Sequence, residues 1–331
     1  MRAAWHEGNG LVFSNHAPSP TLAPNEALVR IHWCGICGSD VQRMQSGPQR
    51  NRILGHECSG IVESIGFHSI QAGDHVVINP VVGCGACAVC LSGASQHCAR
   101  PRSIGKEVSG GFGELVAVPL SNLFKLPSAD LLPIGALADV AAVALHAIDQ
   151  VPGGVAGKRV AIIGDGPIGA MTAVLTGLQG ATVELVGRHP QVAPRLPSSV
   201  VLRHAGSCTT TDDTDVCFEA VGREQGDTLA LAVRRTRPKG TVIVLGVYAP
   251  TYVMPLMARE VFKKELRLIG VNSFDRTSVG GDQFGRAIEV LIAHHQELGA
   301  LITHQFPIER CEEALQTFRE KAGAIKVLMH F

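Results

Sequence analysis

Short apolar runs, separated by glycine, proline and aspartate, follow one another through the first 130 residues. Apolar stretches of four to eight residues bounded by turn-forming residues are typical of β-strands. The runs at 27–32, 60–65, 75–78 and 114–119 are therefore predicted strands, and a cysteine-rich segment at 84–98 interrupts them. The N-terminal part of the chain is predicted to be rich in β-structure.

The pattern changes near residue 133. Residues 134–148 are alanine-rich and apolar, which predicts one buried helix, and Pro152 with the two glycines after it ends this helix. A continuous apolar run at 159–164 predicts a buried strand, and a glycine-rich turn leads from it into a predicted helix at 170–179.

Strand-like and helix-like segments then alternate along the chain. This alternation predicts a parallel sheet covered by helices on both faces. The predicted strands are 183–186, 200–202, 216–220, 241–245 and 266–270, with helices at 225–235 and 252–264. Prolines 190, 194 and 197 predict a truncated helix after strand 183–186. The last segment is predicted to hold helices 283–294 and 308–322 and a strand 325–329 that returns to the first region.

The length of 331 residues is too great for one compact core, so two domains are expected. The β-rich start and the returning end predict a discontinuous first domain, residues 1–148 with 273–331. The alternating part predicts a second domain, residues 149–272, inserted into it. The fold class is therefore α/β, with a β-rich domain and a doubly wound parallel-sheet domain.

The charge balance excludes several classes of partner. Lysine plus arginine equals aspartate plus glutamate, at 29 each, which argues against nucleic acid or an anionic membrane as partner. The first ten residues lack the apolar core of a signal peptide, and the apolar runs are too short and interrupted to span a bilayer. Ten cysteines without such a signal indicate a reducing compartment, so a cytoplasmic location is expected.

Cysteine spacing supplies the most specific chemical signal. The pattern C-x2-C-x2-C-x7-C is formed by Cys84, Cys87, Cys90 and Cys98. Four thiolates at this spacing can close a tetrahedron around one metal ion, and ligation by sulfur alone favours zinc. Four protein ligands leave no open position, which predicts a structural site. Two disulfides and an iron–sulfur cluster are the alternatives.

Residues 164–169 read GDGPIG, the G-x-G-x-x-G pattern of dinucleotide-binding turns. The pattern gains meaning here because it follows an apolar strand and opens a helix. Its glycines allow a tight turn, close approach of a diphosphate and close packing of helix on strand. An ordinary strand-to-helix turn is the alternative. The predicted cofactor-binding residues are Gly164, Gly166, Pro167, Ile168 and Gly169, with Leu245, Gly246 and Val247 further along the chain.

The end of the second strand indicates which cofactor this turn binds. An NAD site has an acid there, which holds the ribose 2′-hydroxyl. In this chain the position is Gly187, followed by Arg188 and His189, and Glu184 lies too early in the strand. An arginine without an acid suits a 2′-phosphate, so NADP(H) is predicted in preference to NAD(H). The alternative is that Arg188 is a solvated loop residue.

A second set of possible metal ligands lies outside the cysteine-rich segment. Cys37 stands in GICGSD, His56 and Glu57 stand in GHECSGIV, and Asp139 lies in the alanine-rich segment. Together with the four cysteines, GDGPIG and FEAVG, these motifs keep the order seen in zinc-dependent medium-chain dehydrogenases/reductases. The chain resembles that family over nearly its whole length, in particular the sorbitol and threonine dehydrogenase-like branch. The resemblance implies a GroES-like catalytic domain and a Rossmann domain.

The resemblance also implies a ligand set for a catalytic zinc, and therefore two zinc ions per chain. Cys37 and His56 match two of the family's zinc ligands, and Asp139 stands at the place of the third. Many sorbitol-type members have a glutamate there, and because aspartate is shorter, ligation through water or a shifted metal is expected. Glu57 matches the family's second acid beside the zinc.

The implied reaction is reversible oxidation of an alcohol, with hydride transfer to nicotinamide. Ser39 matches the hydroxyl that takes the substrate proton, and Asp40 matches the carboxylate that orients the histidine ligand. Many members end this proton relay with a histidine, but this chain has Gln42 at that place. The acids at 57 and 139 favour secondary alcohols of the polyol, sugar-alcohol or cyclitol type as substrates.

Two other functions remain open at this stage. One is a zinc-free reductase of activated double bonds. Reductases of that kind lack a cysteine at the place of Cys37 and lack the four-cysteine segment. The other is a non-catalytic NADP-binding sensor or structural protein on the same scaffold, because function lies in the site and not in the fold. For assembly, the family implies a homodimer or homotetramer joined at sheet edges, with strand 266–270 as a candidate edge.

Overall fold

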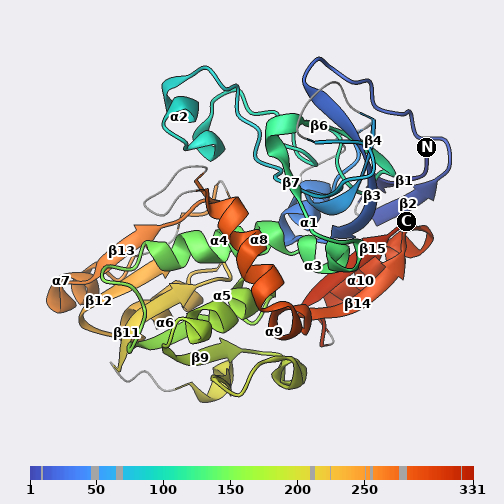
Figure 1. The fold of residues 1–331 in the computed structure, drawn as a ribbon. Coiled ribbons are helices and arrows are strands. Elements are labelled where there is room, and N and C mark those ends of the chain that lie inside the picture. The colour runs from blue at the N-terminus through green and yellow to red at the C-terminus, as the bar shows by residue number, and fades with distance from the viewer. Residues whose placement is uncertain are drawn as a thin grey trace. The chain divides into compact units, whose positions relative to one another are not determined.

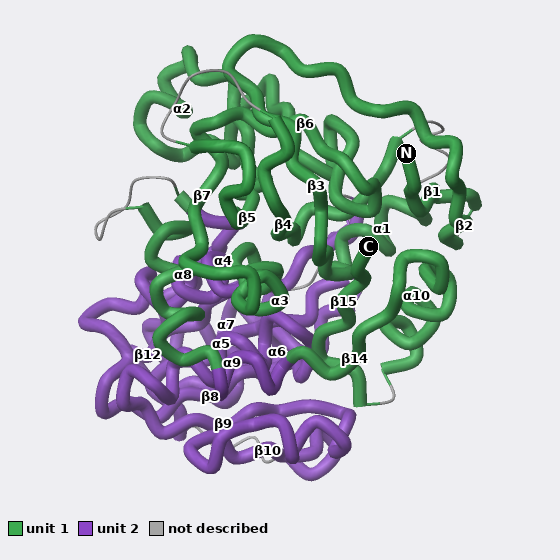
Figure 2. The backbone as a smooth tube through the Cα atoms, turned by 45° about the vertical axis from the view of Figure 1, so that its right-hand side comes forward, with its two compact units in different colours: residues 1–139, 275–295, 302–331 green, residues 140–274, 296–301 purple. Residues whose placement is uncertain are grey.

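The computed structural model describes residues 1–8, 10–45, 52–64, 70–208, 213–223, 225–249, 251–253, 256–275, 282–321 and 323–331. The chain forms two compact units (Figure 2). The first comprises residues 1–139, 275–295 and 302–331, and the second comprises residues 140–274 and 296–301. The predicted functional domains, 1–148 with 273–331 and 149–272, stay a prediction.

The sheet of the first unit combines strands from both ends of the sequence (Figure 1). Its order is β14-β15-β3-β4-β5-β7, with β6 also paired to β3. The pairing of β14 with β15 is parallel and the others are antiparallel. Its strands are β3 (Glu26–Gly35), β4 (Glu57–Ser64), β5 (His75–Ile78), β6 (Leu115–Pro119), β7 (Leu123–Lys125), β14 (Ile302–Pro307) and β15 (Lys326–His330), while β1 (Ala3–Glu7) and β2 (Gly10–Ser14) pair separately.

The register of this sheet brings distant residues together. Gly35, at the end of β3, lies opposite Glu57 on β4 and opposite Leu328 on β15. The C-terminal strand and the start of β4 therefore flank the end of β3 on opposite sides, although nearly 270 residues separate them in the chain. The predicted return of strand 325–329 to the first region is confirmed, and this return places β15 next to the candidate metal site.

The second unit contains a six-stranded parallel sheet in the order β10-β9-β8-β11-β12-β13. This order is that of a doubly wound dinucleotide-binding fold. Helices α5 (Pro167–Leu178), α6 (Asp227–Arg235) and α7 (Ala258–Lys264) pack against it. Its strands are β8 (Arg159–Ile163), β9 (Thr182–Gly187), β10 (Val200–His204), β11 (Thr214–Glu219), β12 (Thr236–Val244) and β13 (Arg267–Gly270). The predicted fold class is confirmed.

The remaining helices include one that the sequence did not suggest. Helix α1 (Gly38–Gln45) is short and mostly polar, with Val41 and Met44 as its only apolar side chains, which explains why the pattern missed it. The truncation predicted from the prolines is seen as a short 3₁₀ helix, Pro190–Arg195. The others are α2 (Ala88–Leu91), α3 (Leu132–Gly135), α4 (Ala138–Asp149), α8 (Gln283–Ala293), α9 (His295–Gly299) and α10 (Cys311–Glu320).

The single helix predicted at 134–148 is wrong. The chain forms α3 and α4 instead, because the backbone N–H of Leu137 bonds to the carbonyl of Ile134 at 2.9 Å, an i→i+3 contact that tightens the last turn and ends α3. Asp139 thereby lies in the first turn of α4. The helix predicted at 252–264 also begins later, at Ala258; residues 254–255 lie outside the described residues.

Among the described residues, no helix has both the length and the apolar character needed to cross a bilayer by itself. One pair, Ala129–Gly135 with Ala138–Asp149, meets these limits together, but a bend of 53° separates its two parts.

Candidate functional site

The four-cysteine segment forms a compact sulfur cluster in the first unit. The Sγ atoms of Cys84, Cys87, Cys90 and Cys98 all lie within 4.8 Å of one another. Gly85 adopts a φ of +71°, which allows the sharp turn after the first cysteine. Gly83 has no room for a side chain, because its Cβ would lie 2.5 Å from the Sγ of Cys90.

Backbone dipoles in this segment favour thiolates. The backbone N–H groups of Ala86 and Cys87 lower the pKa of Cys84 to about 6. The backbone N–H groups of Cys84 and Arg100 donate to the Sγ of Cys98 at 3.3 and 3.4 Å. Four clustered sulfurs with backbone donors around them match a tetrahedral zinc site of the structural type, because four protein ligands leave no coordination position for water or substrate.

A second group of ligand atoms converges from two separate segments of the first unit. Cys37 lies between β3 and α1, His56 directly precedes β4, and Glu57 begins β4. One ligand atom of each lies within 4.8 Å of those of the other two. The Oε1 of Glu57 is buried and has no hydrogen-bond partner among the described residues. A thiolate, an imidazole and an unsatisfied carboxylate oxygen fit a divalent metal such as zinc.

Asp40 orients the histidine of this group. Its Oδ1 lies 3.3 Å from the Nδ1 of His56, and its Oδ2 accepts a hydrogen bond from the backbone N–H of Cys37 at 3.0 Å. Burial works against charge on both partners, but the pKa of Asp40 is lowered and that of His56 is raised well above its ordinary value, because their charges attract. With Nδ1 turned to Asp40, the Nε2 of His56 is the nitrogen available to a metal.

Asp139 approaches this group from α4. Its Oδ2 lies 4.0 Å from the Nε2 of His56, and burial raises its pKa to about 6. The cluster of mutually close ligand atoms contains Glu57 and not Asp139. The predicted role of Asp139 as third zinc ligand therefore stays a prediction. The same holds for Ser39, which is half-buried on α1.

The structure adds a residue that the sequence did not single out. Lys326, the first residue of β15, forms an ion pair with Glu57, and its Nζ donates to the carbonyl of Ile36 at 3.1 Å. Despite burial, the pKa of Lys326 is raised by the charges of Glu57 and Cys37. A lysine within an otherwise apolar strand was the available signal, because such a lysine needs a buried partner.

Cys34 forms a C-x-x-C sequence with Cys37, but its thiol lies next to a cysteine of the neighbouring strand. It lies opposite Cys58 on β4, and the two Sγ atoms are 3.4 Å apart. Both residues are buried, and burial raises the pKa of Cys34 well above its ordinary value. Sequence spacing missed this pair because its members are joined by strand register and lie far apart in the chain.

The dinucleotide turn in the second unit has the geometry that its motif predicts. Gly164 has a φ of +118° between β8 and α5. A Cβ on Gly169 would lie 1.7 Å from the carbonyl oxygen of Gly164, so helix and strand pack too closely for any side chain there. Gly166 precedes Pro167, the first residue of α5, and a Cβ on it would meet nothing within 4 Å. The free N–H groups at this helix start suit a diphosphate.

Glu184, the acid on β9, is engaged in ion pairs with arginines. Glu184 forms ion pairs with Arg235 and, at 2.9 Å, with Arg203. Gly187 ends β9, and Arg188 is exposed with no side-chain partner among the described residues. No acid on β9 is therefore free to hold a ribose hydroxyl in this part of the chain.

The predicted residues 245–247 follow β12. The backbone N–H groups of Leu245 and Gly246 both bond to the carbonyl of Glu219 at the end of β11, at 2.8 and 2.9 Å, and Val247 is 62% exposed. Ends of adjacent parallel strands are where such sheets bind ligands, so the binding role of these residues remains compatible with their position and stays a prediction.

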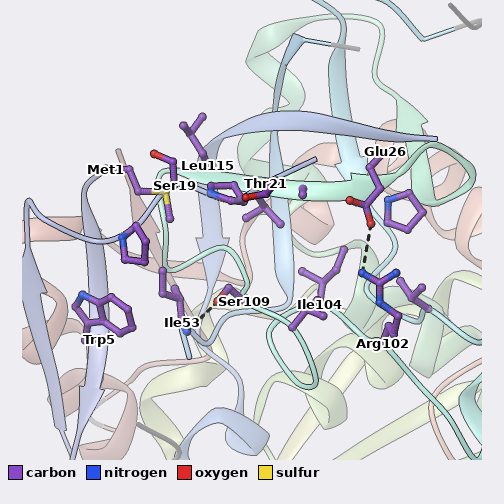
Figure 3. A pocket seen from close by; sticks show the side chains of 17 residues that line it. Met1, Trp5, Ser19, Thr21, Glu26, Ile53, Arg102, Ile104, Ser109 and Leu115 are labelled. Atoms are coloured by element: carbon purple, nitrogen blue, oxygen red, sulfur yellow. Dashed lines mark hydrogen bonds and ion pairs between the residues drawn. The ribbon is translucent and has the colours of Figure 1, made fainter. Parts of the chain in front are cut away.

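A separate pocket of about 330 Å³ lies near the N-terminus of the first unit (Figure 3). Trp5, Ile53 and Ile104 are among its lining residues, and Arg102 pairs with Glu26 at 3.5 Å on its wall. None of the predicted catalytic, metal or cofactor residues lines it. The predicted catalytic and metal-binding residues lie elsewhere in the first unit, and the predicted cofactor-binding residues lie in the second.

Comparison with known proteins agrees with this geometry. Residues 23–128 match the model of the alcohol dehydrogenase GroES-like domain. The chain is 28% identical to L-idonate 5-dehydrogenase of Vitis vinifera, over 94% of this chain and 89% of that protein. It is also 28% identical to sorbitol dehydrogenase of Macaca fascicularis, over 97% and 93%. The chain is thus similar, over nearly its whole length, to dehydrogenases of the zinc-dependent medium-chain family.

A solved structure extends the likeness over the full length of the chain. A protein of Sinorhizobium meliloti, assigned as a zinc-binding dehydrogenase and bound to NADP, is 27% identical, with a TM-score of 0.86 and coverage of 100% of this chain and 98% of that one. The likeness is therefore to dehydrogenases of the alcohol and polyol class. The first unit offers a four-cysteine cluster and a Cys/His/Glu cluster, each of which could hold a metal ion.

Proposed function

We propose that this dehydrogenase interconverts a polyhydroxylated secondary alcohol, of the polyol, sugar-alcohol or cyclitol type, with its ketone, and that it prefers NADP(H). The observation that carries the proposal is the convergence of Cys37, His56 and Glu57, with ligand atoms within 4.8 Å of one another, beside the partly buried carboxylate of Asp139. Relatives named for L-idonate and sorbitol support the polyol class.

Each residue of the site has one task in this reaction. Zinc bound by Cys37 and His56 would supply Lewis-acid polarisation of the alcohol oxygen. Asp40 holds the His56 ring so that Nε2 stays directed to the metal. Asp139 would complete the ligand set of the zinc, directly or through water. Ser39 takes the proton from the alcohol oxygen, and a bound nicotinamide would supply the acceptor for the hydride.

Lys326 and Glu57 set the charge around this site. The ion pair neutralises one carboxylate that would otherwise add a second buried negative charge beside Cys37. Glu57 keeps Oε1 free for transient contact with the metal, while Oε2 stays with Lys326. This division of its two oxygens supports Asp139, and not Glu57, as the lasting third ligand.

The preference for NADP(H) is supported at the end of β9. Glu184 is held by two arginines, Gly187 has no side chain, and Arg188 is exposed. A guanidinium binds a 2′-phosphate through charge-assisted hydrogen bonds. The relative from Sinorhizobium meliloti is bound to NADP, which also supports this preference.

Two further expectations belong to the proposal. The enzyme assembles as a homodimer or homotetramer, supported by β13, which pairs with β12 and has no second neighbour among the described strands. It works in the cytoplasm, where its thiols stay reduced.

Turnover tests this function directly. The zinc-loaded protein is assayed with NADP⁺ and with NAD⁺ against primary alcohols, secondary alcohols, polyols and cyclitols. Turnover with NADP⁺ on polyhydroxylated secondary alcohols is expected; a preference for NAD⁺ overturns the cofactor assignment, and a preference for simple primary alcohols overturns the substrate class.

A pair of cysteine variants separates an enzyme from a cofactor-binding sensor. Cys37→Ser is expected to lose turnover and one zinc while it keeps NADPH binding. Cys34→Ala, at the other cysteine of the same C-x-x-C sequence, serves as the matched control and is expected to keep its zinc and its turnover. Equal affinity of Cys37→Ser and wild type for NADPH, with no turnover by either protein, would support the function of a sensor.

A further inference from the structure

The side chain of Asp165 fills the space beside Gly187. A Cβ built on Gly187 would lie 2.2 Å from the Oδ2 and 2.4 Å from the Cγ of Asp165. Real Cβ atoms essentially never come so close, so position 187 can carry a side chain only if Asp165 moves. Asp165 itself lies in the glycine turn, between Gly164 and Gly166, and is buried.

The carboxylate of Asp165 is directed to His189. The backbone N–H of His189 donates to Oδ2 at 2.7 Å, and the ring Nδ1 lies 3.0 Å from both Oδ1 and Oδ2. Because a carboxylate only accepts, the ring nitrogen that faces it is the one that carries the proton. His189 precedes the 3₁₀ helix Pro190–Arg195, so this contact holds the first residues of the chain that leaves β9.

We infer that Asp165 sets the cofactor preference of this enzyme as a positioning residue, an inference that rests on the proposed use of NADP(H). Its side chain keeps position 187 empty, which excludes an acid from the place where NAD enzymes hold the ribose 2′-hydroxyl. Its hydrogen bonds to His189 keep the adjoining Arg188 at the end of β9, where a 2′-phosphate would bind.

Asp165 does not itself take the place of the missing ribose acid. Both of its oxygens face the backbone and ring nitrogens of His189. Glu184, the acid on β9, is also occupied, by Arg203 and Arg235. The carboxylates next to this strand end are thus engaged with protein donors, while the guanidinium of Arg188 remains exposed.

Binding of the two cofactors to the full-length, zinc-loaded protein tests this role. Calorimetry gives dissociation constants for NADP⁺ and NAD⁺ with wild type, Asp165→Ala and His189→Ala. Asp165→Ala is expected to weaken NADP⁺ binding about tenfold and NAD⁺ binding less than about twofold. His189→Ala should show the same selective loss. Since both cofactors share the diphosphate, an equal loss for both would place the effect in the glycine turn and overturn the inference.

Moving the carboxylate from position 165 to position 187 tests whether side chains at these two positions exclude each other. Gly187→Asp alone is expected to lower the melting temperature of the cofactor-free protein, because two side chains then compete for one space. The double variant Asp165→Ala with Gly187→Asp is expected to regain most of that loss and to prefer NAD⁺. Strictly additive effects on the melting temperature would show that positions 165 and 187 do not exclude each other and would overturn the inference.

The binding constants distinguish failure of the proposed function from failure of this inference. Tighter binding of NAD⁺ than of NADP⁺ by wild type would contradict the proposed cofactor preference. A wild type that prefers NADP⁺, with the same preference in Asp165→Ala, would leave that function intact and contradict the role of Asp165 alone.

Discussion

Lys326 and Glu57 form an ion pair across the end of β3, with side chains that are 2% and 0% exposed. Gly35 lies between them: a Cβ there would be 2.2 Å from the Oε2 of Glu57 and 2.6 Å from the Cε of Lys326. The pair therefore depends on a glycine at position 35. It also joins the last strand of the sheet to the residue that follows His56.

Removal of this lysine is expected to destabilise the protein. Lys326→Met leaves the carboxylate of Glu57 buried without a partner, so the free energy of unfolding should fall by about 3–5 kcal/mol, as measured by urea denaturation. The double variant Glu57→Gln with Lys326→Met carries neither buried charge and should regain much of the loss. A single variant within about 0.5 kcal/mol of wild type would show that the pair contributes little.

Asp139 should make the stability of the metal-free protein depend on pH. Burial raises its pKa from 3.8 to about 6. The folded state therefore binds the proton more tightly than the unfolded state, and the associated stability is full below pH 3.8 and lost as pH rises to about 6. The contribution is about 3 kcal/mol. Urea denaturation of wild type and Asp139→Asn across this range isolates it; parallel curves for the two proteins would contradict the prediction.

The four-cysteine cluster should hold one zinc independently of the other site. Elemental analysis of dialysed protein is expected to find two zinc ions per chain in wild type and one in Cys84→Ser, with a lower melting temperature because the site stabilises its segment. Cys37→Ser is the matched variant and should lose the other ion. Fewer than ten reactive thiols in the denatured, unreduced protein would instead favour disulfides.

Lys264 should stabilise the end of α6. Its buried Nζ donates to the carbonyls of Val233, Arg234 and Thr236 at 3.2, 2.7 and 3.1 Å. Lys264→Met leaves these carbonyls without a charged donor and should lower the free energy of unfolding by about 1–3 kcal/mol. The exposed neighbour provides the control: Lys263→Met should change it by less than about 0.5 kcal/mol. Equal effects of the two variants would contradict the capping role.

Cys34 and Cys58 should resist thiol reagents in the native protein. Both are buried, and the raised pKa of Cys34 keeps it as the unreactive thiol. Iodoacetamide followed by peptide mass spectrometry should modify the partly exposed Cys208 first, and Cys34 and Cys58 only after unfolding. Modification of all three at similar rates would mean that the sheet opens readily between β3 and β4.

Features that depend on neighbours in sequence were predictable. The strand at 75–78 coincides with β5, and the glycine pattern placed the turn before α5, because both depend on adjacent residues alone. The four cysteines converge as their spacing indicated, since at most fourteen positions separate them. Cys37 and His56 were found through resemblance to a family and not through their spacing.

Features that depend on register were not predictable. Lys326 reaches Glu57 because β15 pairs with β3, and Cys34 meets Cys58 because β3 pairs with β4; neither pairing has a local signal. Helix α1 has only two apolar side chains, Val41 and Met44. The end of α3 came from one tightened turn, whose i→i+3 hydrogen bond no propensity scale indicates. Tertiary contacts therefore decided the two strand pairings, whereas α1 and the end of α3 gave too weak a local signal.

The three glycines of the cofactor turn are present for different reasons. Gly164 and Gly169 are imposed by the protein's own backbone, which leaves no room for a Cβ on Gly169 and holds Gly164 at positive φ. Gly166 has ordinary extended dihedrals and open space around it, so nothing within the described protein requires it to be glycine. The need for glycine at position 166 therefore comes from the bound dinucleotide. A homologue that no longer binds a dinucleotide is expected to change residue 166 before the other two glycines.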